Sequence, residues 1–92
     1  MKKIKLSFEG CKYFDEVHER MKKVFGFPEY YGENADALWD LLQYWFDEKE
    51  RVEIEVYGLA SLPKEWEEEM ELIFGVFADV CKKYPNVSFV RC

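Results

Sequence analysis

The chain has 92 residues, of which 49% are hydrophobic and 18% aromatic, and its 19 acidic and 13 basic side chains give a formal net charge of -6. This length suits a single domain over residues 1–92 and leaves no room for a second core. The apolar content excludes a disordered chain. The negative charge disfavours direct binding to nucleic acid, whose phosphates would repel it, and favours a basic protein as partner.

The N-terminal residues 1–8 alternate between polar and apolar side chains, which predicts a β-strand with Ile4, Leu6 and Phe8 on its apolar face. This segment begins with lysines, as a signal peptide does, but the continuous apolar stretch of a signal peptide does not follow them. No segment of the chain reaches the apolar length of a membrane span. We therefore expect a cytoplasmic protein without a membrane partner.

A first helix is expected from about Asp15 to Phe25, with Asp15 as its N-cap and Gly26 as its C-terminal stop. The apolar side chains at helical spacing are Val17, Met21, Val24 and Phe25. His18 lies at the edge of this stripe, and the sequence places no nucleophile or carboxylate partner beside it. We expect a packed or hydrogen-bonded structural histidine there, not a catalytic one.

A second helix is expected from Asn34, a good N-cap residue, to about Phe46. At 100° per residue, one side gathers apolar residues for the core and the other gathers polar ones, with Trp39 at the border. The core side consists of Ala37, Leu38, Leu41, Leu42 and Trp45, and the outer side of Asp36, Asp40, Gln43 and Asp47. Asp36 and Asp40 repel each other at this spacing. The helix N-terminus stabilises negative charge in the first turn, but Asp40 lies beyond that turn. Fold stability therefore gives little reason for this acidic pair.

Aromatic side chains flank the acidic pair, with Tyr30 and Tyr31 in the linker before the helix and Tyr44 on its outer face. Aromatic residues beside charge that few lysines neutralise are typical of a protein interface. The plain alternative is an ordinary solvated helix face, and the pattern by itself does not separate the two.

The C-terminal half alternates again at Val52, Ile54 and Val56 and at Val87 and Phe89, which predicts two further strands. Between them, a long helical pattern runs from about Pro63 to Lys83 and is interrupted by Gly75. A short helix or loop over residues 59–63 precedes it. The apolar stripe of the long pattern consists of Trp66, Met70, Ile73, Phe74, Phe77 and Val80. Strands joined by helices, each with one apolar face, predict an α/β fold: a small three-stranded parallel sheet with three to four helices packed mainly on one side.

The three cysteines, Cys11, Cys81 and Cys92, are widely spaced, no CxxC motif is present, and the chain has one histidine. This pattern makes a zinc site improbable, and we expect neither a metal nor a cofactor. Cys81 is expected to be a small core residue and the other two cysteines to be incidental.

The segment from Pro28 to Asp40, PEYYGENADALWD, closely resembles the signature of the barstar family, the intracellular inhibitors of barnase-type ribonucleases. The resemblance extends over nearly the whole chain and implies a barstar-like fold with a basic ribonuclease as protein partner, in a 1:1 complex. It implies that Asp40 enters the phosphate-binding centre of that enzyme. The contact residues that it implies in this chain are Tyr30, Gly32, Asn34, Ala35, Asp36, Trp39, Asp40, Trp45 and Asp79, with Gln43 and Tyr44 at the rim.

This chain departs from the family pattern at several of these positions. Ala35 replaces a larger apolar residue, Gln43 replaces a threonine, Tyr44 replaces a glycine, and Asp79 has a shorter side chain than its acidic counterpart. A tyrosine at the rim would either clash with barnase itself or fit an enzyme of different shape. The resemblance thus implies the family's mode of binding, while these departures leave the particular partner open.

Four functions remain open at this point. The first is inhibition of a ribonuclease by carboxylates that stand in for the substrate phosphate, and the second is immunity against a different toxin nuclease or effector. The third is a hydrolase that uses Asp36 and Asp40 as acid and base or as magnesium ligands, although no catalytic motif accompanies them. The fourth is a scaffold or dimerisation domain. We expect an inhibitor that is not itself an enzyme.

Overall fold

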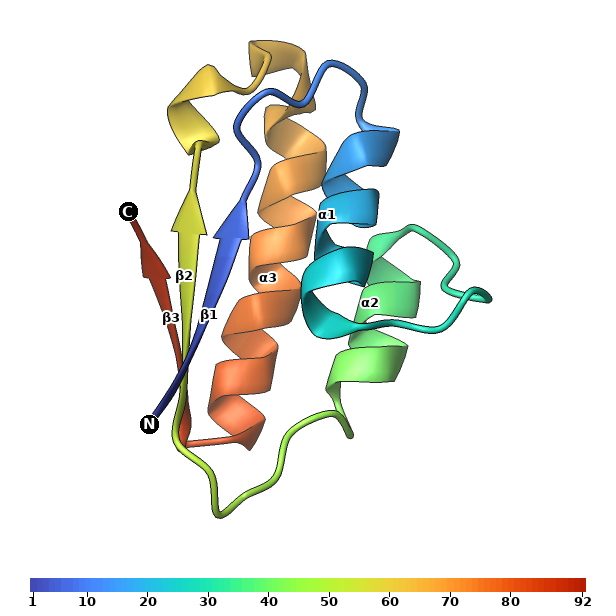
Figure 1. Ribbon diagram of the computed structural model, residues 1–92. Helices are drawn as coiled ribbons and strands as arrows, with labels where there is room; N and C mark the ends of the chain where they lie inside the picture. The colour runs from blue at the N-terminus through green and yellow to red at the C-terminus, as the bar shows by residue number, and fades with distance from the viewer.

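In the computed structural model, which describes residues 1–92, three helices cover one side of a three-stranded sheet (Figure 1). The elements in chain order are β1 (Lys2–Ser7), α1 (Asp15–Phe25), α2 (Ala35–Leu42), β2 (Val52–Tyr57), the short 3-10 helices η1 (Leu59–Ser61) and η2 (Lys64–Trp66), α3 (Glu67–Lys83) and β3 (Val87–Arg91). The predicted α/β fold with a small parallel sheet is confirmed.

The sheet has the order β1-β2-β3, and β2 pairs in parallel with both neighbours. Helices α1 and α2 lie in the connection from β1 to β2, and α3 lies in the connection from β2 to β3. Alternate side chains of the strands, including Leu6, Ile54 and Val56, are fully buried beneath the helices. Helix α2 packs against α3 and lies farther from the sheet than α3 does (Figure 1).

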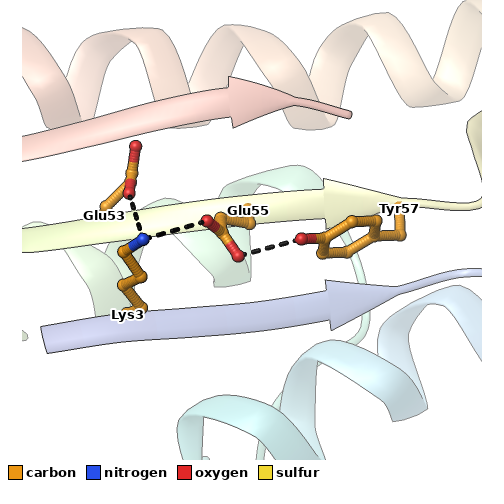
Figure 2. Close-up of polar contacts among 4 residues, drawn as sticks. All are labelled: Lys3, Glu53, Glu55 and Tyr57. Carbon is orange, nitrogen blue, oxygen red and sulfur yellow. Dashed lines mark hydrogen bonds and ion pairs between the residues drawn. The ribbon is translucent and has the colours of Figure 1, made fainter.

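The face of the sheet that the helices leave open carries polar side chains (Figure 2). Lys3 Nζ lies 3.9 Å from a carboxylate oxygen of both Glu53 and Glu55, and the Tyr57 hydroxyl donates a hydrogen bond of 2.9 Å to Glu55. That hydrogen bond raises the pKa of Tyr57 to about 12. Partly exposed ion pairs of this length contribute roughly 0–1 kcal/mol each, so these surface contacts add little to the stability of the sheet.

The predicted second helix is too long: α2 ends at Leu42, not near Phe46. The Tyr84 hydroxyl donates a 2.7 Å hydrogen bond to the Gln43 carbonyl. The Trp45 amide donates a 3.1 Å hydrogen bond to the Leu42 carbonyl, three residues earlier. The chain therefore turns at the point where the periodicity would have continued. Trp45, predicted to face the core, is 38% exposed as a result.

Two smaller expectations about the N-terminal half are also wrong. The N-cap of α1 is Phe14, not Asp15, and in place of an Asp15 cap the Glu16 carboxylate accepts hydrogen bonds from the amides of Lys12 and Tyr13, both at 3.1 Å. Cys11 is the buried cysteine. Cys81 is only half-buried, because it lies beside the core stripe of α3 and not within it.

The long C-terminal pattern divides into η2 and an uninterrupted α3, in which Gly75 is exposed and a Cβ there would meet no neighbour. No helix is long and apolar enough to cross a bilayer. No cluster of three or more histidine, cysteine or acidic side chains is placed to hold a metal ion.

Candidate functional site

The outward face of α2 presents two exposed carboxylates, those of Asp36 and Asp40. The opposite face is buried, with Leu38 and Leu42 fully covered, and Trp39 is half-buried between the two faces. This division agrees with the one predicted from the periodicity. Neither carboxylate forms an ion pair or a hydrogen bond within the chain. Both groups are therefore free to bind a cation or a donor on another molecule.

The turn before α2 is held by the side chain of Asn34. Its Oδ1 accepts a 2.8 Å hydrogen bond from the Ala37 amide, and its Nδ2 donates a 3.2 Å bond to the Gly32 carbonyl. Glu33 adopts a left-handed backbone with φ of 52°, which side chains other than glycine rarely adopt. A Cβ on Gly32 would lie 3.2 Å from the Ala37 Cβ, so glycine lets this turn lie close against the helix. Asn34 and Gly32 thus set where α2 begins and where the linker lies.

Replacing Asn34 with alanine is expected to lower the free energy of unfolding by about 1 kcal/mol, because the Ala37 amide loses its cap. Asn34→Ser keeps an acceptor at this position and is expected to retain most of the stability. Urea unfolding of the three proteins measures the difference. Equal losses in the two variants would show that the cap does not stabilise the helix.

A pocket of about 220 Å³ lies between this linker and α2, lined by Tyr30, Tyr31, Gly32, Ala37, Asp40 and Leu41. It brings together three residues that were predicted as contacts, Tyr30, Gly32 and Asp40. Tyr30 is 81% exposed, so most of its aromatic ring is available for contact with another molecule. The neighbouring Tyr31 is buried, with 6% of its surface exposed.

Tyr31 anchors the linker from beneath. Its hydroxyl is hydrogen bonded at 2.7 Å to Nδ1 of His18 in α1, and its ring lies 4.9 Å from that of Phe27. Phe27 in turn packs edge-on against Trp45 at 5.1 Å between centroids. His18 is the structural histidine that was predicted, since it is 3% exposed and hydrogen bonded. These contacts hold Tyr31 and Phe27 in the core, and so they position the neighbouring Tyr30 and the contacting Trp45 at the surface.

Burial lowers the pKa of His18 below its ordinary value of 6.5, and the Asp15 carboxylate offsets part of this shift. The unfolded chain therefore binds more protons than the folded chain as pH falls through 6.5, so the free energy of unfolding should fall there. It should change little between about pH 7.5 and pH 8, below the range in which the Cys11 and Cys81 thiols titrate, whose pKa values burial raises. The variant His18→Gln, which cannot titrate, should lose this slope between pH 7.5 and 5.5 in urea unfolding. The lowered pKa of Glu29, caused by its hydrogen bond with Lys22, acts below pH 4.5 and leaves this window unaffected. An unchanged slope in His18→Gln would contradict the assignment.

Beyond the end of α2, the rim residues meet the last turn of α3. Tyr44 is 78% exposed, and Nζ of Lys83 lies 4.2 Å from the centre of its ring. Gln43 is half-buried, and its carbonyl accepts the Tyr84 hydroxyl. Asp79 is exposed on α3, 4.0 Å from Lys82. The two helices therefore contribute to one end of the molecule, where they end together in Figure 1.

The predicted contacts differ in how available their side chains are. Those of Tyr30, Asp36, Asp40, Tyr44 and Asp79 are exposed, and that of Trp45 is 38% exposed. The side chain of Asn34 is engaged in its own cap, and Ala35 is half-buried. Lys83 was not predicted, because nothing in its local sequence shows that it lies over Tyr44. Tyr31 was predicted only as an aromatic neighbour, and its bond to His18 depends on packing between α1 and the linker.

Comparison with known proteins gives two matches. The sequence profile of the family described as "Barstar (barnase inhibitor)" matches residues 1–90. A protein of Bacillus subtilis (strain 168), named "Putative ribonuclease inhibitor YrdF", is 40% identical over 47 residues. That match covers 51% of this chain and 52% of the relative, so about half of each protein is aligned.

Proposed function

This chain belongs to the barstar family, and from this premise we propose that it inhibits a ribonuclease by occupying the enzyme's active site. The name of the relative YrdF is that of a ribonuclease inhibitor. The observation that carries the proposal is the pair of exposed carboxylates on α2, Asp36 and Asp40, which have no partner within the chain. The protein would act in the cytoplasm, as a binding protein and not as an enzyme.

The proposed mechanism is mimicry of the substrate's charge. An enzyme that cleaves RNA must bind a phosphate with cationic and hydrogen-bonding side chains. The Asp40 carboxylate would occupy the place of that phosphate and accept charge-assisted hydrogen bonds from those cations, which are roughly twice as strong as neutral ones. Asp36, one turn earlier on the same face, would add negative charge beside it.

Rigidity of α2 favours this mechanism. The Asn34 cap fixes the first turn, Leu38 and Leu42 are buried in the core, and the Tyr84 hydrogen bond holds the last turn. Because these contacts exist in the free protein, little conformational entropy is lost when Asp40 binds. A carboxylate on a mobile loop would lose more.

Aromatic side chains around the carboxylates would exclude water from the charged contacts. Tyr30 lines the pocket that Asp40 also lines, Trp39 is half-buried beside it, and Trp45 is partly exposed. Large aromatic residues dominate the energetics of protein interfaces when they surround polar contacts in this way. Removing water also strengthens the attraction between each carboxylate and its cation.

The test is a titration of barnase and a panel of basic ribonucleases with the purified chain. We expect the cleavage of RNA by at least one enzyme to fall linearly and to stop at one inhibitor per enzyme. The association rate should decrease as salt is added, because the net charge of -6 attracts a basic partner over distances that salt screens. Catalytic turnover of RNA by the chain itself, or full activity of every enzyme at a large excess of the chain, would contradict the proposal.

A second candidate is an immunity protein against a different toxin nuclease or effector. Gln43 and Tyr44 favour it, because an exposed tyrosine at the rim changes the shape that a partner must match. Including nucleases of other types in the same panel separates the two functions. Inhibition of one of these, with every barnase-type enzyme unaffected, would favour the second candidate.

A further inference from the structure

The cationic side chain of Lys83, on the last turn of α3, lies beside the residues that follow α2. Lys83 Nζ lies 4.2 Å from the centre of the Tyr44 ring and 5.7 Å from that of Tyr84. Lys83 is exposed and takes part in no ion pair. An ammonium group is attracted to the face of an aromatic ring at this distance, which restricts the positions that the side chain adopts. The charge of Lys83 is therefore localised at the surface but not neutralised.

The backbone beneath this contact is fixed by the neighbouring residues. The Tyr84 hydroxyl donates a 2.7 Å hydrogen bond to the Gln43 carbonyl, and Tyr84 is 4% exposed. Tyr44 and Lys83 each adjoin one member of this bonded pair along the chain. Tyr44 also follows Asp40 by four residues, just beyond the end of the helix that carries the acidic pair. The backbone at Lys83 consequently has a set position relative to the end of α2.

Placing such a cation in the proposed interface has an electrostatic consequence. A ribonuclease cleft that binds Asp40 is cationic, and a lysine brought to its rim would be repelled by like charge. The repulsion becomes attraction where the enzyme presents a carboxylate at that point of the rim. We infer that Lys83, held on Tyr44, is a specificity-determining contact that pairs with an acidic side chain at the rim of the ribonuclease's active-site cleft.

The inference rests on the proposed function. It predicts that Lys83→Glu weakens binding, whereas the simplest alternative predicts that the same change strengthens it. If Lys83 were only a surface lysine within a steering field, Lys83→Glu would make the chain more acidic and would speed association with a basic enzyme. If Lys83 pairs with an acidic rim residue, the same change places two carboxylates together and speeds dissociation. Lys83→Gln removes the charge without this repulsion and should show a smaller change of the same sign.

Lys64 provides a matched control at the opposite end of α3. Lys64 is also exposed, and it lies in η2 just before α3, whereas Lys83 is the last residue of that 17-residue helix. The helix spans about 25 Å at 1.5 Å per residue. Lys64→Glu therefore changes the net charge equally at the far end of α3 from the proposed contact.

The experiment measures the association and dissociation rates of these variants by surface plasmon resonance with the ribonuclease that the unmodified chain inhibits most strongly. We expect Lys83→Glu to weaken binding about tenfold or more, chiefly through faster dissociation, and Lys64→Glu to change it less than about threefold. Tyr44→Leu should lose more affinity than Tyr44→Phe, because only phenylalanine keeps an aromatic face under the ammonium. In the free protein, the side-chain proton resonances of Lys83 should carry a ring-current shift that Tyr44→Leu removes.

Equal or tighter binding by Lys83→Glu would overturn the inference, and so would equal losses in Lys83→Glu and Lys64→Glu. If Asp40→Ala abolishes inhibition in the same assay while Lys83→Glu does not weaken it, only the role of Lys83 is wrong. If the unmodified chain inhibits no ribonuclease of the panel, the proposed function fails and the inference fails with it.

Discussion

Asp40→Ala is expected to weaken the complex with the inhibited ribonuclease by about 3–5 kcal/mol, which is at least about a hundredfold in Kd. The reason is that the enzyme's cations, brought out of water by the complex, would be left without a carboxylate to bind. The free chain should lose little stability, because Asp40 is exposed and has no partner within the chain. Calorimetry of binding and urea unfolding of the same protein separate these two effects.

Glu68→Ala is the matched control for Asp40→Ala. Glu68 is an exposed acid in the first turn of α3 and is not among the proposed contacts, so its removal changes the net charge by the same amount on a different helix. We expect it to slow association slightly and to leave dissociation unchanged, since a remote charge contributes mainly to steering. If Asp40→Ala cost only a few tenths of a kcal/mol, or no more than Glu68→Ala, charge mimicry at Asp40 would be wrong.

Phe77→Ala is expected to lower the free energy of unfolding by about 3–5 kcal/mol, the usual cost of removing a buried phenylalanine side chain. Phe77 is 1% exposed, stacks on Phe89 of β3 at 4.4 Å between centroids, and lies 6.4 Å from Phe25 of α1. It therefore joins the sheet to two helices, and the cavity left by alanine would be bounded by elements that cannot easily move together. Since a domain of this size is stable by only about 5–14 kcal/mol, the variant should unfold at a much lower urea concentration.

Leu72→Ala is the control on the same helix, because Leu72 is a large apolar side chain that is 61% exposed. Its replacement should change the free energy of unfolding by less than about 0.5 kcal/mol. Denaturant unfolding followed by circular dichroism compares the two variants directly. A loss for Phe77→Ala as small as that for Leu72→Ala would mean that the core is not organised around the contacts of α3 with the sheet.

The strands and the first helix could be predicted from the sequence because their periodicities arise from local geometry. Alternation at Val52, Ile54 and Val56 occurs because successive side chains of a strand point to opposite faces, and here only one face is covered. Gly26 ends α1 in a left-handed conformation that glycine adopts without strain, as expected. The acidic face of α2 was predictable for the same reason, since Asp36 and Asp40 repeat at helical spacing.

The end of α2 could not be predicted in this way. The apolar period continues to Trp45, but the Tyr84 hydroxyl holds the Gln43 carbonyl and the chain turns. This hydrogen bond joins a residue just after α2 to a residue just after α3. The two residues are therefore too far apart along the chain for a local sequence pattern to reveal the bond. The burial of Cys11 in place of Cys81 has a similar origin, because it depends on where the loop after β1 packs.

The sequence by itself therefore determined the class of fold, the helix that bears the acidic pair, and the motif from Pro28 to Asp40 that is shared with a family, because each lies within one continuous segment. Only the tertiary structure decided which side chains stand beside that pair. Tyr31 is buried on His18 while Tyr30 stays exposed, and Lys83 is brought over Tyr44. These contacts join segments that are distant in the chain, and they form only when the helices pack on one another and on the sheet.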